Sequence, residues 1–183
     1  SLNSMNFPTE GNKVSINLAW QKDSYQASES QGIAPKDKSL AITFDWRGAY
    51  NFSNHTIMGI ASFATVNNDT DFTVHVTELG GFLNLSGYQK DELIGAHKGL
   101  LALVYQYDLG RELFGKSSLP LYVGFSVEEG KVWDISESIN LDDLIHSGSL
   151  YLGTDTDFGP AVFGIGFASE GESTLFLSLG KSF

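Results

Sequence analysis

One stretch of the sequence matches a phosphate-binding pattern, Gly110-Arg111-Glu112-Leu113-Phe114-Gly115-Lys116-Ser117. In such a loop the glycine amides surround the phosphates, the lysine reaches them, and a helix follows whose N-terminus faces the anion. Here Pro120 and an alternating, strand-like segment follow within a few residues. Because the helix that this chemistry needs is missing, we interpret the segment as a basic turn between two strands.

The other side chains that could do chemistry are scattered along the chain. The histidines stand at His55, His75, His97 and His146. None has a second histidine or a carboxylate at the helical spacing of a metal site. Glu137, Asp142 and Asp143 carry oxygen ligands for a divalent cation, but a solvated acidic loop is the simpler interpretation. A Gly-x-Ser-x-Gly elbow for serine hydrolysis is absent from the sequence, so we expect no catalytic residue, no metal site and no cofactor.

Composition narrows the class of protein. The 183 residues are 42% hydrophobic and include no cysteine, which favours one folded domain over residues 1–183 without disulfides. Acidic residues outnumber basic ones 22 to 11, which argues against nucleic acid as a partner. Twenty glycines against four prolines, with many aromatic residues, favour strands over helices. No apolar run reaches the roughly 18 residues of a membrane helix, but a barrel strand needs only about 10 alternating residues.

Alternation of apolar and polar residues predicts about eight antiparallel strands. The clearest examples place Val14, Ile16 and Leu18 on one face of a strand, and Phe125 and Val127 on one face of another. The predicted strands cover residues 13–21, 40–47, 56–66, 98–107, 119–128, 150–154, 161–168 and 175–183. One face is nearly all aliphatic and aromatic, whereas the other mixes Gly, Ser and Thr with charges. The tryptophans and Tyr105 and Tyr107 lie near predicted strand ends, as at a membrane interface.

The connections between these strands also differ in length. Long polar stretches at 23–37, 67–97 and 130–147 contrast with short ones at 49–54 and 155–159, although 108–118 is longer than ideal. Long loops on one side and short turns on the other are typical of up-and-down outer-membrane barrels. With strands counted alternately up and down, the C-terminus falls on the short-turn side, which is the periplasm in such barrels.

A second interpretation stays open, because a soluble barrel of the lipocalin type that binds a small apolar ligand has about eight alternating strands too. Asp45, Arg47 and Glu128 separate the two, since they lie on the less apolar face. In a transmembrane barrel they are charges of the lumen. In a ligand-binding barrel the apolar face turns inward and these charges lie on the surface.

Motifs in four regions carry a resemblance to a known family. Phe7-Pro8-Thr9-Glu10-Gly11 resembles a strand-opening Phe-Pro-Thr-x-Gly signature, and Leu79-Gly80-Gly81-Phe82 resembles a loop motif that usually reads Val-Arg-Gly-Phe. The stretch from Phe125 to Trp133, with Glu128 and Gly130, resembles the strand whose acidic residue faces that arginine. Asp155 to Pro160, with Gly159, and the tail from Leu175 to Phe183 resemble the last two strands. The family is the BamA and two-partner-secretion outer-membrane barrel superfamily, or bacterial surface antigen family.

Within that superfamily, Gly80 to Tyr88 followed by Asp91-Glu92-Leu93 is most similar to the C-terminal barrel of bacterial patatin-like phospholipases. The resemblance implies the C-terminal half of a barrel that anchors a surface protein in the bacterial outer membrane and helps to translocate it. It implies outer-membrane lipid and the barrel-assembly machinery as partners, and a lipase domain upstream of this chain. It also assigns an assembly signal to Leu175, Leu177, Leu179, Gly180 and Phe183. The first five residues lack a secretory signal, so we expect a processed end or a fragment boundary.

Two structural expectations follow. Gly80 stands where the family has its arginine while Glu128 remains, so we expect Arg47 to compensate and to lie close to Glu128 or to Asp45. The lumen of an eight-stranded barrel has room only for its own side chains, so the loop 67–97 could not fold into it. We therefore expect two chains to pair edge to edge as a homodimer with a barrel of about 16 strands.

Overall fold

The fold is an antiparallel sheet in a computed structural model that describes residues 2, 7–24, 36–68, 77–111, 119–134 and 137–180, apart from the side chains of 21–24, 36–39 and 68. The strands are β1 (Gly11–Ser24), β2 (Lys36–Phe52), β3 (His55–Asn68), β4 (Thr77–Leu79), β5 (Leu93–Gly95), β6 (His97–Asp108), β7 (Leu121–Trp133), β8 (Ile145–Thr156), β9 (Gly159–Ala168) and β10 (Ser173–Leu179). No helix in the described part of the chain is long and apolar enough to cross a membrane.

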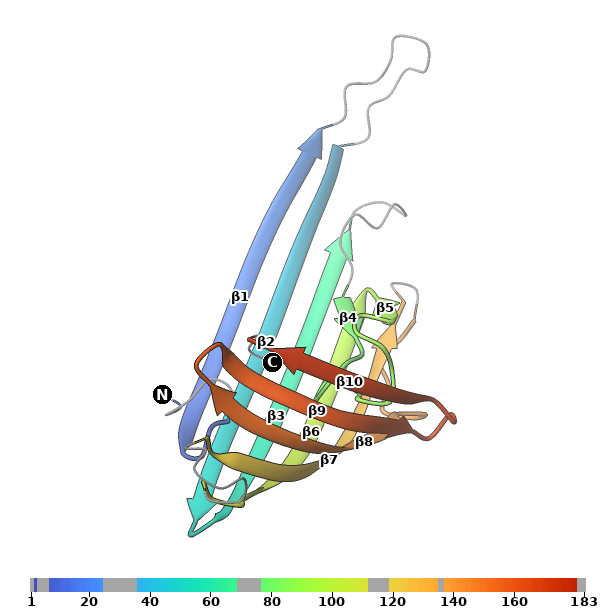
Figure 1. The fold of residues 1–183 in the computed structure, drawn as a ribbon. Coiled ribbons are helices and arrows are strands. Elements are labelled where there is room, and N and C mark those ends of the chain that lie inside the picture. The colour runs from blue at the N-terminus through green and yellow to red at the C-terminus, as the bar shows by residue number, and fades with distance from the viewer. Residues whose placement is uncertain are drawn as a thin grey trace.

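Eight strands form one up-and-down sheet in the order β1-β2-β3-β6-β7-β8-β9-β10, each antiparallel to its neighbour (Figure 1). The predicted all-β class and the number of long strands are therefore confirmed. β4 and β5 form a separate small hairpin within the connection between β3 and β6. The strand predicted at 150–154 is longer in the structure and covers Ile145–Thr156. The prediction missed its first residues because the buried Ser147 and Ser149 weaken the apolar pattern there.

The closed barrel that the sequence predicted is not formed, since β1 and β10 are the two ends of the sheet and are not paired with each other. The sheet curls so that β9 and β10 cross in front of β2 and β3 (Figure 1). A cavity of about 970 Å³ separates them, lined by β2, β3, β10 and the loop between β4 and β5.

Connection lengths follow the predicted asymmetry. At one end of the sheet the connections are residues 53–54 and 157–158, whereas the other end carries 25–35, 69–96 and 134–144. The turn 169–172 is a short connection at the long-loop end, and 109–120 is a long one at the short-turn end. β1 begins and β10 ends at the short-turn end.

The two faces of the sheet have opposite character. On β7, Val123, Phe125 and Val127 are exposed, whereas Gly124, Ser126 and Glu128 are buried. The same alternation runs through β6, β8 and β9. We call the face with the exposed apolar side chains the outer face and the opposite one, against which the loop packs, the inner face.

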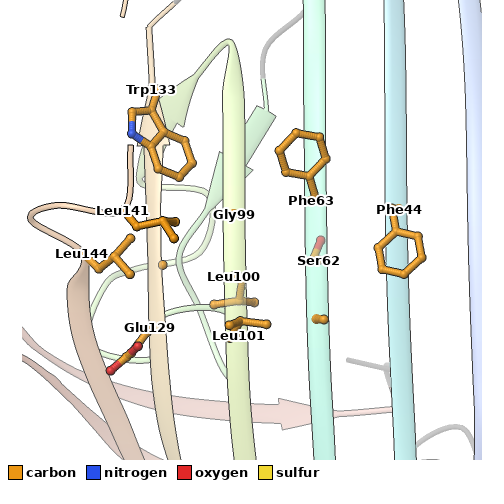
Figure 2. Close-up of a pocket in the computed structure, with 12 residues that line it drawn as sticks. Phe44, Ser62, Phe63, Gly99, Leu100, Leu101, Glu129, Trp133, Leu141 and Leu144 are labelled. Carbon is orange, nitrogen blue, oxygen red and sulfur yellow. The ribbon is translucent and has the colours of Figure 1, made fainter. Parts of the chain in front are cut away.

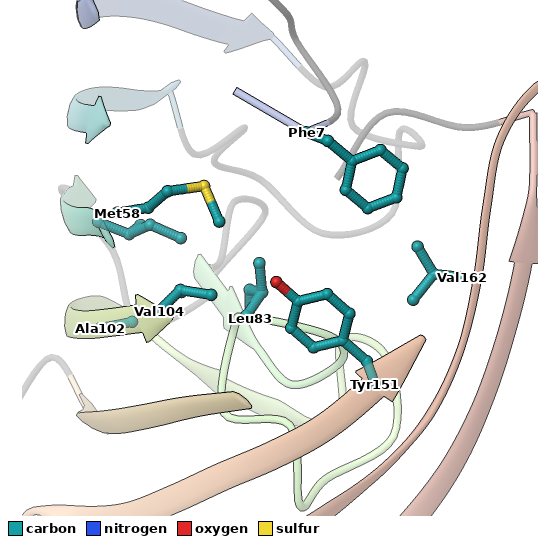
Figure 3. Close-up of a cluster of buried hydrophobic side chains, with 8 residues drawn as sticks. Phe7, Met58, Leu83, Ala102, Val104, Tyr151 and Val162 are labelled. Carbon is teal, nitrogen blue, oxygen red and sulfur yellow. The ribbon is translucent and has the colours of Figure 1, made fainter. Parts of the chain in front are cut away.

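The buried core lies on the inner face rather than between two sheets. Met58, Ile60 and Val104 pack with Leu83 of the loop. Phe7, in the segment before β1, belongs to the same cluster, and its ring lies near Tyr151 and Val162 (Figure 3). The N-terminal segment and the loop thus meet over the inner face of the strands that hold the candidate site.

Candidate functional site: a loop bound to the inner face

The loop between β4 and β5, residues 80–92, has a compact backbone that glycine makes possible. Gly80 and Gly81 adopt φ of 122° and 103°, and Leu83, Leu85 and Asp91 also have positive φ. The Gly80 amide donates to the Asn84 carbonyl at 2.7 Å, and the Asn84 amide donates to the Gly81 carbonyl at 3.0 Å. A Cβ at position 80 would lie 2.1 Å from the Gln89 carbonyl oxygen. The arginine that the resemblance led us to expect at position 80 therefore has no room there, because no side chain fits at this position.

Ser86 and Glu128 form the central contact of the site. The Ser86 amide donates to Oε2 of Glu128 at 2.7 Å, and the Ser86 hydroxyl donates to Oε1 at 2.6 Å. The Ser126 hydroxyl adds a third hydrogen bond, to Oε1 at 2.5 Å. Both Glu128 and Ser86 are 0% exposed. A buried carboxyl group is costly unless several donors surround it, and here the loop supplies two of three.

Small residues on the inner face make room for the loop. A Cβ at Gly166 of β9 would lie 1.8 Å from the Ser86 carbonyl oxygen, and one at Gly130 of β7 would lie 3.4 Å from the Leu85 side chain. The Gly87 amide donates to the Ser147 hydroxyl at 2.9 Å, and the Thr174 hydroxyl donates to the Gly87 carbonyl at 2.9 Å. The loop is therefore bonded to β7, β8 and β10 and touches β9.

The end of the loop is held at the turn between β9 and β10. The Tyr88 hydroxyl donates a short hydrogen bond to the Glu170 carboxylate. Burial, together with this bond to Glu170, raises the pKa of Tyr88 above its ordinary value. Phe82, at the other end, packs its ring 5.0 Å from Tyr151 and 4.6 Å from Phe176. Contacts at both ends fix the orientation of the loop across the sheet.

The structure brings together some of the charges that the sequence placed in the lumen. Glu128 accepts its hydrogen bonds from Ser86 and Ser126. The loop therefore supplies donors to Glu128, which we had expected Arg47 to do. Arg47 lines the inner cavity and interacts electrostatically with Asp45, the other partner we considered. Asp45 also accepts a hydrogen bond from the Ser62 hydroxyl at 2.7 Å.

The family-motif residues fall into three places. Phe7 and Pro8 are buried and Thr9, which follows them in the sequence, is half-buried. Gly11 begins β1 with φ of 109°. Gly80, Gly81 and Phe82 belong to the loop, and Gly130 lies beneath it. Gly159 and Pro160 begin β9 at the short-turn end. Of the residues that we expected to form an assembly signal, Leu175, Leu177 and Leu179 point outward and Gly180 follows them, whereas Phe183 lies outside the described residues. Residues 112–117 of the phosphate-loop segment lie outside them too.

Trp133 corrects one expectation, because it is buried rather than exposed at an interface. Its indole lies over Gly99 at one end of an apolar groove of about 230 Å³ on the outer face (Figure 2). Phe63, Leu101 and Leu141 also line this groove. The indole Nε1 has no hydrogen-bond partner among the described residues.

Sequence reasoning missed Ser86, Ser147, Tyr88 and Glu170. Ser86 stood inside the quoted Gly80 to Tyr88 segment, but nothing in its spacing pointed to Glu128. Ser147 alternates with outward residues, which was a usable signal for an inner position. No known protein family matches this sequence, and no curated protein does so either.

Proposed function

We propose that this chain forms the wall of a β-barrel in the bacterial outer membrane and anchors a surface protein of the patatin-like phospholipase type. The observation that carries the proposal is the outer face. Its large apolar side chains are exposed along neighbouring strands, with Leu150 at 58% and Leu177 at 77%. A water-soluble protein rarely exposes so continuous an apolar surface, whereas a barrel needs one against lipid.

The inner face supports the same proposal. Glu128, Ser126 and Gln106 are buried there, where a transmembrane barrel has its polar lumen. A barrel that binds a small apolar ligand would instead turn its apolar face inward. The distribution of side chains therefore favours the anchor over the lipocalin-like alternative.

The nature of the parent protein comes from the resemblance of the loop and strand motifs. The site supports anchoring better than translocation, because the loop is bonded to three strands and fills the inner side of the wall. We propose outer-membrane lipid as the surroundings of the outer face. The apolar groove between Phe63 and Trp133 would accept part of a lipid chain there.

The barrel-assembly machinery is the proposed partner during insertion. Leu175, Leu177 and Leu179 give the alternating outward pattern that such a signal needs, and Phe183 would complete it. Deleting Phe183 should lower the amount of inserted protein in cells and leave the unfolding midpoint of the purified barrel unchanged. A lower unfolding midpoint with normal insertion would show instead that Phe183 contributes to folded stability and not to insertion.

The test of the anchor compares two exposed aliphatic residues. Leu150 lies in the middle of β8, and Ile139 is exposed in the connection between β7 and β8. In lipid, Leu150→Arg should destabilise the protein by about 2–4 kcal/mol, since an arginine near the membrane midplane costs that much. Ile139→Arg is the control and should change little.

Unfolding is measured by denaturant titration in lipid vesicles, and insertion by extraction of membranes with urea. Wild-type protein should stay in the membrane until detergent is added. A chain that is soluble and monomeric without detergent, in which both arginine variants are equally harmless, would refute the anchor.

A further inference from the structure

The outer face carries an aromatic cluster at its short-turn end, and His55 is at its centre. This histidine is the first residue of β3, directly after the turn 53–54. The registers of the sheet place Phe52 of β2 and Tyr107 of β6 directly opposite His55, one on each side. The three side chains lie on the outer face, since the next residue of β3, Thr56, is buried on the inner face.

Aromatic rings hold the imidazole of His55 in one orientation. The ring of Phe52 stacks on the imidazole at 5.1 Å with an interplanar angle of 10°, and the ring of Tyr107 meets it edge-on at 5.0 Å. The Tyr105 hydroxyl forms a hydrogen bond of 2.6 Å with Nδ1 of His55. Tyr50 extends the group beyond Phe52, with its ring 6.4 Å away. We call Tyr50, Phe52, His55, Tyr105 and Tyr107 the His55 cluster.

The His55 cluster offers hydrogen-bond donors to its surroundings. If the Tyr105 hydroxyl donates to Nδ1, the proton of the neutral imidazole is on Nε2. If Nδ1 donates instead, the Tyr105 hydroxyl keeps its own proton to donate elsewhere. One donor is therefore left over in either tautomer. In the part of the chain that the structure describes, Nε2 and the hydroxyls of Tyr50 and Tyr107 have no hydrogen-bond partner.

The cluster lies where the apolar surface ends. Towards the middle of the sheet the ring of Tyr105 packs 5.3 Å from that of Phe125, which belongs to the exposed apolar surface. On the other side of the cluster is the polar turn of Ser53 and Asn54. This inference rests on the proposed membrane location of the outer face. In that location the cluster lies at the depth of the glycerol and phosphate groups of lipids, where amphipathic rings are favoured.

The charges near the two ends of the outer face differ. At the long-loop end, the exposed His146 lies 3.1 Å from the carboxylate of Glu129. At the short-turn end, the residues that pair with His55 are neutral. The one carboxylate of β6, that of Asp108, accepts a hydrogen bond from the Gly110 amide at 2.8 Å. An anion would therefore meet a like charge at His146 but not on the strands next to His55.

We propose that the His55 cluster binds the phosphate group of a phospholipid in the leaflet that surrounds the short-turn end. A phosphate supplies several acceptor oxygens at once, and a charged acceptor strengthens each hydrogen bond. Donors at the edge of the hydrocarbon are costly to leave unpaired, so their pairing favours the bound lipid. The donor left over by the pair of His55 and Tyr105 is the central one, and the Tyr107 hydroxyl is beside it. The acyl chains then lie along the exposed Ile57 and Leu103.

Retention of lipid by the purified protein tests the chemistry of the site. Protein in detergent is mixed with dioleoyl phosphatidylglycerol, with dioleoyl phosphatidylcholine or with a dioleoyl glycolipid that has no phosphate, and bound lipid is counted by native mass spectrometry. Both phospholipids should be retained about tenfold better than the glycolipid, since a hydrogen bond to a charged group contributes at least that factor. Retention of phosphatidylcholine alone would show that the aromatic faces bind its ammonium group and would overturn the proposal. Equal retention of all three lipids would overturn it too.

Two substitutions test the donors. His55→Phe removes the ring nitrogens and keeps an aromatic ring between Phe52 and Tyr107, so retention of phosphatidylglycerol should fall about tenfold. Tyr107→Phe keeps the imidazole and removes one hydroxyl, and it should lower retention by a smaller factor. His146→Phe is the matched control, because it removes an outer-facing histidine at the opposite end of the sheet, and it should leave retention unchanged. Equal effects of His55→Phe and His146→Phe would contradict the assignment.

A measurement in vesicles separates the lipid site from the anchor. Protein with isotope-labelled histidine is inserted into phosphatidylglycerol vesicles, and contacts between histidine nitrogen and lipid phosphorus are recorded by solid-state nuclear magnetic resonance. The signal of His55, identified by its loss in His55→Phe, should show such a contact. Inserted protein in which this signal shows no contact with phosphorus would overturn the proposal and leave the anchor intact. A protein that remains in solution beside the vesicles would instead refute the anchor.

Discussion

One half of the sheet, formed by β3 and β6 to β9, differs from the other, formed by β1 and β2, in what covers its inner face. On β7 and β8 the inner residues Ser126, Glu128 and Ser149 are buried under the loop. On β1 the inner residue Ser15 is half-buried and Asn17 is exposed, although β1 is as regular a strand. Regular pairing is thus common to both halves, whereas side-chain packing is concentrated where the loop lies. The difference predicts where substitutions matter.

The largest effect is expected at Glu128. Glu128→Ala leaves three donors on Ser86 and Ser126 without their acceptor, and we expect a loss of about 3–5 kcal/mol in the free energy of unfolding. Glu129, the next residue, lies on the outer face next to His146 and is exposed. Glu129→Ala is therefore the matched control and should cost less than about 1 kcal/mol. Equal losses, measured by denaturant titration, would show that the two faces do not differ.

Gly166→Ala should displace the loop. The new methyl group would meet the backbone of Ser86, which cannot move aside as a flexible side chain can, so a loss of about 1–3 kcal/mol is expected. Gly59→Ala is the control, because its neighbour is the ring of Trp46 on the outer face. Faster proteolysis within 80–92 in the first variant alone would confirm that the glycine seats the loop.

A pair of serine substitutions compares the two halves directly. Ser86→Ala removes the hydroxyl that donates to Glu128 and accepts from the Leu83 amide at 2.9 Å, at an expected cost of about 1–3 kcal/mol. Ser15→Ala, on the inner side of β1, should stay within about 0.5 kcal/mol. Should thermal unfolding give the same midpoint for both, the loop would not be the main source of packing.

The smallest effect is expected at Tyr88, where Tyr88→Phe removes one hydrogen bond to Glu170 and should cost about 1 kcal/mol. The raised pKa of Tyr88 gives this prediction a pH dependence. The folded state holds the phenol proton more tightly than the unfolded state, whose pKa is near 10, so the associated stability is present below pH 10 and is lost as the pH rises above it. Wild-type protein should therefore lose stability more steeply than Tyr88→Phe above pH 10, and parallel curves would contradict this.

Sequence alone predicted the strands and their faces because alternation is local. The alternate positions of Val123, Phe125 and Val127 predict an outward face whatever residues lie on the neighbouring strands. The contact between Ser86 and Glu128 could not be predicted in this way, since it joins residues 42 positions apart and depends on the backbone of Gly80 and Leu83. Arg47 was expected near Glu128 or Asp45 by charge type alone; it interacts electrostatically with Asp45, whereas the donors to Glu128 are the neutral Ser86 and Ser126. The β4–β5 hairpin was hidden in a long loop because each strand has only three residues.

The insertion of β4 and β5 between β3 and β6 has a consequence for the order of folding. The other neighbouring strands are joined by connections of between two residues (53–54) and 12 residues (109–120), whereas β3 and β6 pair across the 28 residues 69–96. Closing this longer connection costs about 2 kcal/mol more chain entropy than closing a two-residue turn. Two ribbons, β1–β3 and β6–β10, are therefore expected to form first and to join late. The second ribbon already contains Glu128, whose carboxylate is without its loop donors until the loop docks. Because the loop lies in the connection between β3 and β6, we expect docking of Ser86 onto Glu128 to bring the two ribbons together.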